Sequence, residues 1–215
     1  MMLVVPLTVI IGVVVFSDRM YAWISLAIAV ITVAALLLSM EKKQADVQKI
    51  ILISVMVSLS VAGRALCAWL PHFNPVTAIV IVTGIYLGSE AGFICGAFSA
   101  LLSNFVFGQG PWTPFQMFSW GMIGLLAALL SKSLKNSRIM LILFGATSGM
   151  LYSLIMDIWT ALWLDGTLNF SRYIVALISS SPVMVVYVIS NILFLLLLAK
   201  PIGDKLGRII TKYGI

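Results

Sequence analysis

Long apolar runs, separated by short polar turns, follow one another along the whole chain. They cover roughly residues 2–17, 21–40, 48–70, 75–88, 91–106, 115–131, 139–163 and 172–199. A helix that crosses a bilayer needs about 20 mostly apolar residues, so the pattern predicts eight helices, two of them short enough to be tilted, re-entrant or incompletely crossing. The predicted fold is an all-α integral membrane protein.

Composition supports a membrane location. Of the 215 residues, 62% are hydrophobic and only 9% are charged, whereas a soluble domain carries about 25% charged residues. A chain of this size cannot hide that much apolar surface, so lipid must cover much of it. The first run has no basic residue before it and no small-x-small cleavage site after it, which predicts a retained helix rather than a signal peptide.

Basic residues gather in three of the predicted connections. Lys42, Lys43 and Lys49 lie in one, Lys132, Lys135 and Arg138 in another, and Lys200, Lys205, Arg208 and Lys212 in the C-terminal segment. With eight crossings, all three clusters fall on one side. Basic loops prefer the cytoplasm, so both termini are predicted to be cytoplasmic in the cell membrane. The net charge of +6 is therefore a topology signal, which argues against nucleic acid as a partner.

The same counting divides the chain into three parts. Residues 1–47 form a predicted helical hairpin and cytoplasmic connection, residues 48–199 a six-helix core, and residues 200–215 a basic tail. Cys67 and Cys95 are predicted near opposite membrane faces, too far apart for a disulfide.

Two charged residues interrupt the apolar runs. Arg64 and Asp157 lie about sixteen and eighteen residues into their helices from the cytoplasmic side, which predicts a similar depth in the outer half of the bilayer. Charges at that depth usually face a cavity or each other. One interpretation is a structural ion pair between Arg64 and Asp157. The other is that one or both line a ligand pocket, and the two are compatible.

Amides and large aromatic side chains gather at the predicted outer face. Apolar walls with a few placed polar groups are typical of a small-molecule site, although some of the aromatic residues would also suit an interfacial belt. His72 is the single histidine, so no metal site is predicted. The candidate ligand-binding residues are Arg64, His72, Asn74, Asn104, Gln109, Trp112, Gln116, Trp120, Asp157 and Trp163.

The segment "FGQGPWTPFQMFSWG", residues 107–121, is an unusually aromatic turn. Pro111 and Pro114 restrict the backbone, since each fixes φ near −65°, and Gly108 and Gly110 permit turns that other residues resist. Either this is a plain tight turn, or it is a rigid loop that holds Gln109 and Trp112 above a pocket.

Small residues recur at every fourth position of the run "IILISVMVSLSVAGRAL". Ser54, Ser58 and Ala62 therefore form one stripe on the helix. Such stripes let helices approach closely in membranes, and this one could serve internal packing or an external partner. The sequence shows no catalytic constellation and no cofactor motif, so an ATP-driven process would need its ATPase on another polypeptide.

Residues 50–199 resemble the substrate-binding S components of energy-coupling factor (ECF) vitamin transporters. The resemblance rests on six core helices after Lys49, the small-residue stripe in the first of them and the polar outer face. The run from Gly63 to Leu130, including "GQGPWTP", is similar to the subgroup linked to cobalamin and related corrinoids.

The resemblance implies a subunit that captures a vitamin from outside with the loops after core helices one, three and five. It then topples against a transmembrane coupling protein (EcfT), which is driven by two cytoplasmic ATPases. The stripe would contact the coupling protein, although the family usually has alanines where this chain has Ser54 and Ser58. The two extra N-terminal helices also depart from the family's pattern.

Other functions fit less of the pattern. The ligand could be α-ribazole or another vitamin or precursor rather than a corrinoid. An intramembrane enzyme would have to use Asp157 and His72, and a secondary transporter would need no ATPase. The leading expectation is a corrinoid-binding S component without enzymatic activity.

Overall fold

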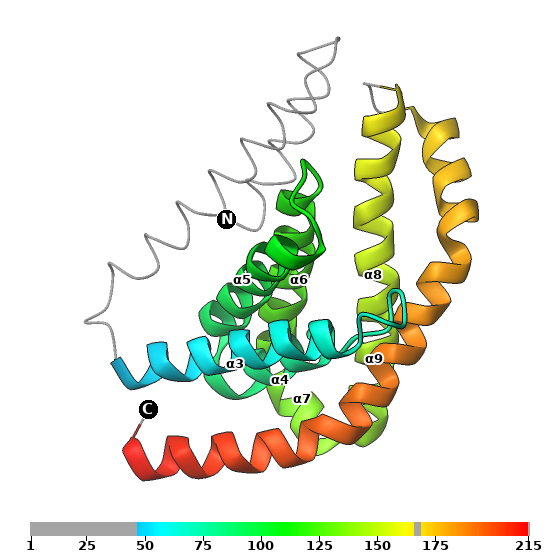
Figure 1. Cartoon of the computed structure of the whole chain (residues 1–215). Helices are drawn as coiled ribbons and strands as arrows, with labels where there is room; N and C mark the ends of the chain where they lie inside the picture. The colour runs from blue at the N-terminus through cyan, green and yellow to red at the C-terminus, as the bar shows by residue number, and fades with distance from the viewer. Residues whose placement is uncertain (1–46, 166–168, 215) are drawn as a thin grey trace.

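The computed structural model describes residues 47–165 and 169–214, and regular structure in that part of the chain is helical. The helices are α3 (Val47–Leu66), α4 (Val76–Leu87), α5 (Ser89–Phe107), α6 (Thr113–Leu129), α7 (Ser131–Asn136), α8 (Arg138–Asp165) and α9 (Phe170–Tyr213). Figure 1 shows them as a bundle that is crossed at a slant by α3 and by the C-terminal part of α9. The predicted helices 2–17 and 21–40 lie outside the described residues.

The six predicted core helices are confirmed, with shifted ends. The helix predicted over 48–70 ends at Leu66, and the residues that follow form turns up to Pro71. His72 in this turn has a φ of 65°, a conformation that most residues avoid. The segment predicted as a basic tail, residues 200–215, is helical as far as Tyr213 and continues α9.

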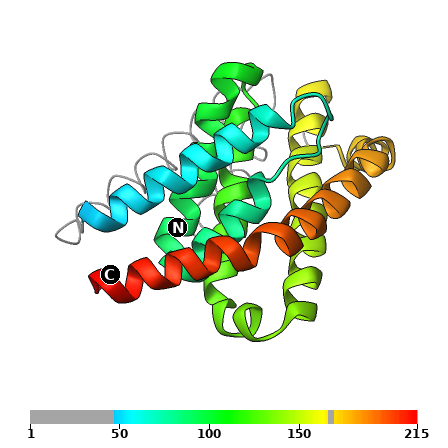
Figure 2. The same ribbon diagram turned by 60° about the horizontal axis from the view of Figure 1, so that its bottom comes forward.

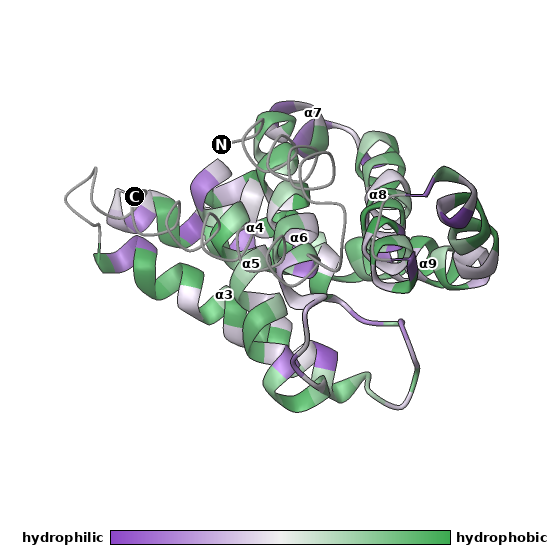
Figure 3. Ribbon diagram, turned by 90° about the horizontal axis from the view of Figure 1, so that it is seen from above, coloured by the Kyte–Doolittle hydropathy of each residue, from purple (hydrophilic) through white to green (hydrophobic). Residues whose placement is uncertain are grey.

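The described chain has the surface of a multi-pass membrane protein. Four helices, α3, α5, α8 and α9, are long and apolar enough to cross a bilayer. Large apolar side chains remain exposed along them, and Figure 3 shows hydrophobic residues over most of the ribbon, with hydrophilic ones at α7 and towards the C-terminus. Lipid accounts for such a surface, since soluble monomers rarely expose apolar patches of this extent.

Glycines hold α4, α5 and α6 together. A Cβ atom on Gly84 or on Gly92 would overlap the backbone of Gly124, and one on Gly124 would overlap the backbone of Gly92. Such close backbone approach is how membrane helices gain contact area without a hydrophobic drive between them. The twelve-residue α4 is buried along almost its entire length, so it forms the centre of the bundle rather than a lipid-facing span.

The helix α9 is too long for a simple crossing. Its 44 residues extend about 66 Å at 1.5 Å per residue, whereas the hydrocarbon core is about 30 Å thick. It contains Pro182 and Pro201, the residue type at which helices bend. Figures 1 and 2 show that α9 curves and that its C-terminal part lies across one end of the bundle, running opposite to α3.

Candidate functional site

Arg64, near the end of α3, points into the bundle and binds α5. Its Nη1 atom donates to Ser103 Oγ and, over 3.0 Å, to Asn104 Oδ1. The guanidinium carbon lies 4.5 Å from the ring centroid of Phe107 and 5.3 Å from that of Trp120, within cation–π range. The cation is therefore held by neutral oxygens and aromatic faces.

The polar contacts continue from Asn104 into α6. Asn104 Nδ2 donates to Thr113 Oγ1 over 2.9 Å and to Gln116 Oε1 over 2.7 Å. Gln116 Nε2 then donates to the Tyr152 hydroxyl on α8 over 3.1 Å. Asn104, Gln116 and Tyr152 are all buried. Buried amides persist only when their donors and acceptors are paired, so these contacts fix the relative positions of α5, α6 and α8.

Two further side chains extend this network to the α3–α4 turn. The Tyr152 hydroxyl is hydrogen bonded to Tyr187 on α9, and the Tyr187 hydroxyl lies 3.1 Å from His72 Nδ1. Burial, and secondarily the charge of Arg64, lowers the pKa of His72, which favours the neutral imidazole. We call this set the Arg64–His72 network: Arg64, Ser103, Asn104, Gln116, Tyr152, Tyr187 and His72.

Trp120 packs against the network through its aromatic ring. Its ring stacks on Tyr152 with centroids 5.1 Å apart and planes 20° apart, and the side chain is 1% exposed. The indole Nε1 has no hydrogen-bond partner within the described part of the chain. An unmade bond at a buried donor costs about 1–3 kcal/mol, so an acceptor that reached this atom would be stabilised.

Of the two interpretations of Arg64 and Asp157, the structural ion pair is wrong. Asp157 accepts a 2.6 Å hydrogen bond from Ser180 Oγ on α9 and lines a separate cavity of about 310 Å³ between α8 and α9. It lies five positions beyond Tyr152, about 7.5 Å further along α8. Because α3 crosses the bundle at a slant (Figure 1), counting residues from the basic end overestimated how far Arg64 reaches towards Asp157.

Two of the remaining predicted residues, Asn74 and Gln109, lie near the Arg64–His72 network. Asn74 lies near the network, where its backbone N–H donates to Ser190 Oγ over 3.0 Å. Gln109 Nε2 donates to the Leu101 carbonyl over 2.7 Å, and its Oε1 accepts from Thr113 Oγ1 over 3.0 Å, so the "GQGPWTP" turn is tied to the network through Thr113.

The predicted tryptophans outside the network lie nearer the surface. Trp112 is partly exposed beside Gly110, where a Cβ atom would overlap the indole ring. Trp163 is 49% exposed near the end of α8 and packs against Trp159, with ring centroids 5.4 Å apart. It does not join the network.

Sequence reasoning missed Ser103, Tyr152 and Tyr187. These residues lie inside long apolar runs, where a single hydroxyl gives no signal of its own. Ser103 carries a signal in retrospect, because it is adjacent to Asn104 and two polar side chains in succession are unusual in an apolar run.

Comparison with known families decides the class of the protein. Residues 44–206 match the family model described as the S component of the ECF-type riboflavin transporter. The chain belongs to this family. No curated protein and no solved structure matched. The predicted cobalamin subgroup is not supported, because the matching model is named for riboflavin.

The family assignment settles the class of activity. An ECF S component is a substrate-binding transport subunit and not an enzyme, so the enzymatic alternative based on Asp157 and His72 is set aside. ECF S components work with a transmembrane coupling protein and two ATPases. Hydrolysis of ATP therefore belongs to other polypeptides.

In this S component, the small-residue stripe of α3 lies on the surface. Ser54, Ser58 and Ala62 are exposed, whereas Met56 and Ser60 on another face of the helix are buried. The serine hydroxyls donate within their own helix, each over 2.9 Å, to the carbonyls of Ile50 and Ser54. The stripe thus presents small side chains whose hydrogen-bonding capacity is already used.

Proposed function

We propose that this S component binds riboflavin, or a closely related flavin, at the Arg64–His72 network and passes it to the coupling protein. Two features support the ligand class: the family model is named for riboflavin, and the network combines amides with stacked aromatic rings. Asn104 and Gln116 each carry a donor and an acceptor, which would complement the alternating carbonyl and imide groups at the edge of a flavin once their present hydrogen bonds are exchanged for bonds to the ligand. Trp120 and Tyr152 offer flat faces for its ring system.

The single observation that carries this proposal is the buried Nε1 of Trp120, which has no hydrogen-bond partner among the described residues and lies beside the hydrogen-bonded network. The described part of the chain offers this donor no acceptor, whereas a bound flavin carries carbonyl and ring-nitrogen acceptors. Arg64 also retains donor capacity beyond its two hydrogen bonds, since a guanidinium has five N–H groups. The ligand would then complete a site that the protein alone leaves incomplete.

Entry of the ligand requires the bundle to open. Trp120 is 1% exposed, so a flavin that stacks on it must first displace neighbouring side chains. The hydrogen bonds from Asn74 and His72 to α9 join the α3–α4 turn to the bundle, and the turn at 108–112 lies next to Thr113. We infer that these two segments form the lid, with the outward orientation predicted from the basic clusters.

The binding test uses purified full-length protein and four ligands: riboflavin, flavin mononucleotide, cobalamin and α-ribazole. Riboflavin is expected to bind with quenching of its fluorescence, because a stacked indole or phenol quenches an excited flavin. The variant Trp120→Phe should weaken binding about tenfold, the loss of roughly one hydrogen bond. The matched control Trp163→Phe should leave affinity unchanged.

Two results would reject parts of the proposal. Binding of cobalamin without riboflavin would restore the corrinoid ligand predicted from the sequence. Equal losses in Trp120→Phe and Trp163→Phe would remove the network as the binding site while leaving the flavin assignment intact.

We further propose that the α3 stripe of Ser54, Ser58 and Ala62 contacts the coupling protein. Its hydroxyls are paired within the helix, so burying the stripe leaves no orphaned polar group. Ser58→Leu should retain ligand affinity but lose co-purification with the coupling protein. The control Val185→Leu, at an exposed position on α9, should retain both, and loss of ligand binding in Ser58→Leu alone would contradict the assigned role.

A further inference from the structure

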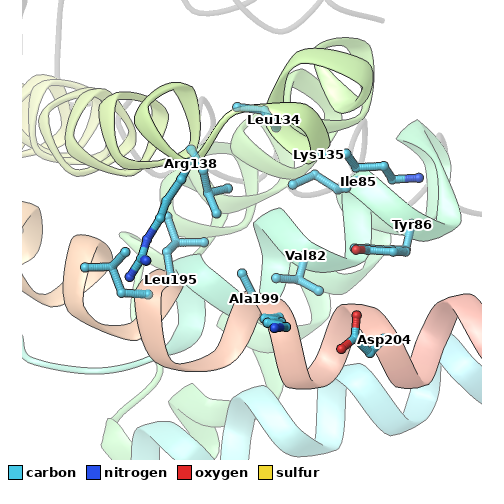
Figure 4. A pocket seen from close by; sticks show the side chains of 12 residues that line it. Val82, Ile85, Tyr86, Leu134, Lys135, Arg138, Leu195, Ala199 and Asp204 are labelled. Atoms are coloured by element: carbon cyan, nitrogen blue, oxygen red, sulfur yellow. The ribbon is translucent and has the colours of Figure 1, made fainter.

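A second cavity lies at the other end of the bundle, far from the Arg64–His72 network. It has a volume of about 420 Å³ and is enclosed by α4, α7, the start of α8, and α9 (Figure 4). Arg138, one of its lining residues, precedes Tyr152 by fourteen positions on α8, or about 21 Å. The cavity is therefore independent of the proposed vitamin site.

Apolar side chains form about half of the cavity wall. Val82 and Ile85 contribute from α4, Leu134 from α7, Leu141 from α8, and Leu195 and Ala199 from α9. Leu134 and Leu195 are almost fully buried, so the wall belongs to the packed bundle rather than to a loose surface. A ligand that fills this space must itself carry an apolar part, because apolar walls stabilise apolar atoms that leave water.

The polar lining of the cavity has an excess of positive charge. Lys135, Arg138 and Lys200 supply three cations against the single carboxylate of Asp204. The one salt bridge within the described chain joins Arg172 to Asp165, so these four groups form none there. Lys135 Nζ instead lies 4.6 Å from the ring centroid of Tyr86.

A neighbouring open cavity extends the basic surface. It shares Tyr86 and Asp204 with the 420 Å³ cavity and adds Arg208 and Lys212 from the last turns of α9. The C-terminal part of α9 lies across this end of the bundle (Figure 2), where a helix longer than the bilayer must leave the hydrocarbon. An apolar space bordered by unpaired cations thus opens where lipid headgroups lie.

We propose that this cavity binds the phosphate group of an anionic phospholipid. Lys135, Arg138 and Lys200 contact the phosphate, and the first carbons of the lipid lie along the more accessible apolar residues Leu141, Leu196 and Ala199. Juxtamembrane basic groups attract anionic lipids, and the apolar wall explains why a lipid fits better than a free ion. The bound lipid anchors α9 against α4 and α7 at the end predicted to be cytoplasmic.

The test uses the full chain in an uncharged detergent and three probes: dioctanoyl phosphatidic acid, dioctanoyl phosphatidylcholine and inorganic phosphate. The double variant Lys135→Gln/Arg138→Gln should bind phosphatidic acid about thirtyfold more weakly, since two cation–phosphate contacts are lost. The matched control Lys132→Gln/Lys205→Gln removes the same charge from exposed positions that line neither cavity, and its affinity should change less than about twofold.

Several outcomes would overturn the proposal. Equal weakening in both double variants would indicate general surface charge, and equal binding of phosphatidylcholine would indicate an apolar site without headgroup recognition. Inorganic phosphate that binds as tightly as phosphatidic acid would identify a free ion as the ligand. If the double variant fails to fold by circular dichroism, the exposed single variant Lys200→Gln must still weaken phosphatidic acid binding, or the cavity is not the site.

Discussion

The substitution Gln116→Leu gives the most direct measure of the Arg64–His72 network. Leucine keeps most of the side chain's volume but removes the 2.7 Å hydrogen bond from Asn104 and the 3.1 Å hydrogen bond to Tyr152. Both partners retain another contact, Asn104 with Thr113 and Tyr152 with Tyr187. The loss is therefore that of two hydrogen bonds, without the larger cost of orphaned buried groups.

The size of the effect follows from measurements on membrane helices. Interhelical hydrogen bonds there average about 0.6 kcal/mol and reach about 1.7 kcal/mol, so two bonds contribute about 1–2 kcal/mol to the free energy of unfolding. For a chain of this size, 1 kcal/mol shifts Tm by about 2–4 °C. Gln116→Leu should thus lower Tm by about 2–8 °C in detergent, measured by thermal denaturation of the ligand-free protein.

A control and a double-mutant cycle separate the network from general packing. Thr147→Val removes a hydroxyl whose 3.0 Å bond stays within α8 on an exposed face, so its Tm should change by less than about 1 °C. Gln116→Leu and Tyr152→Phe should be non-additive, because they remove the same hydrogen bond. Strict additivity, or an unchanged Tm in Gln116→Leu, would show that α6 and α8 are not joined as described.

Two further predictions concern the turn at His72 and the glycine core. Burial and the charge of Arg64 lower the pKa of His72 below its usual 6.5. The unfolded state therefore binds the proton more readily, and stability is lost as pH falls below about 6.5. The drop in Tm between pH 7.5 and 5 should be smaller in His72→Gln than in the unsubstituted protein, and identical pH profiles would contradict this. The Cβ atom of Gly124→Ala would overlap the Gly92 backbone, so this variant should lose about 1–3 kcal/mol of free energy of unfolding. The control Gly207→Ala has open space around the new Cβ atom and should be neutral or slightly stabilised by the helix propensity of alanine. Equal stabilities of the two variants would refute the close packing of α5 and α6.

Sequence periodicity predicted the core helices because each lipid-facing span must be continuous and apolar. It placed the start of α6 at residue 115, two residues after the observed start at Thr113, and Pro114 lies in the first turn of the helix, where proline is well tolerated. It did not predict that α4 is buried on all sides or that α9 extends to Tyr213. Hydrophobicity alone cannot distinguish a residue facing lipid from one facing another helix, and helix length beyond the membrane depends on packing.

The candidate site was predictable in part. Arg64, Asn104 and Gln116 stand out because polar groups inside apolar runs must be paired, and the structure brings these three together. The partner of Arg64 was not predictable, because depth counted along the chain assumes that every helix runs along the membrane normal. The slant of α3 is decided by tertiary contacts such as the fit of Gly63 against Pro75, which no single-helix pattern encodes.

The helix α3 carries both proposed interactions on opposite faces. Ser60 and Arg64 lie four positions apart on the face that packs into the bundle, and Ser54, Ser58 and Ala62 lie on the exposed face. The two rows are offset by two residues, or about 200° around a helix with 3.6 residues per turn. A ligand that moves Arg64 therefore also moves the stripe, because a helix turns as a stiff unit. Substitutions on the two faces should nevertheless separate ligand affinity from energised uptake, and Ser58→Leu should abolish uptake at unchanged affinity. A stripe variant that weakened ligand binding as strongly as Arg64→Gln would show that the two faces do not act separately.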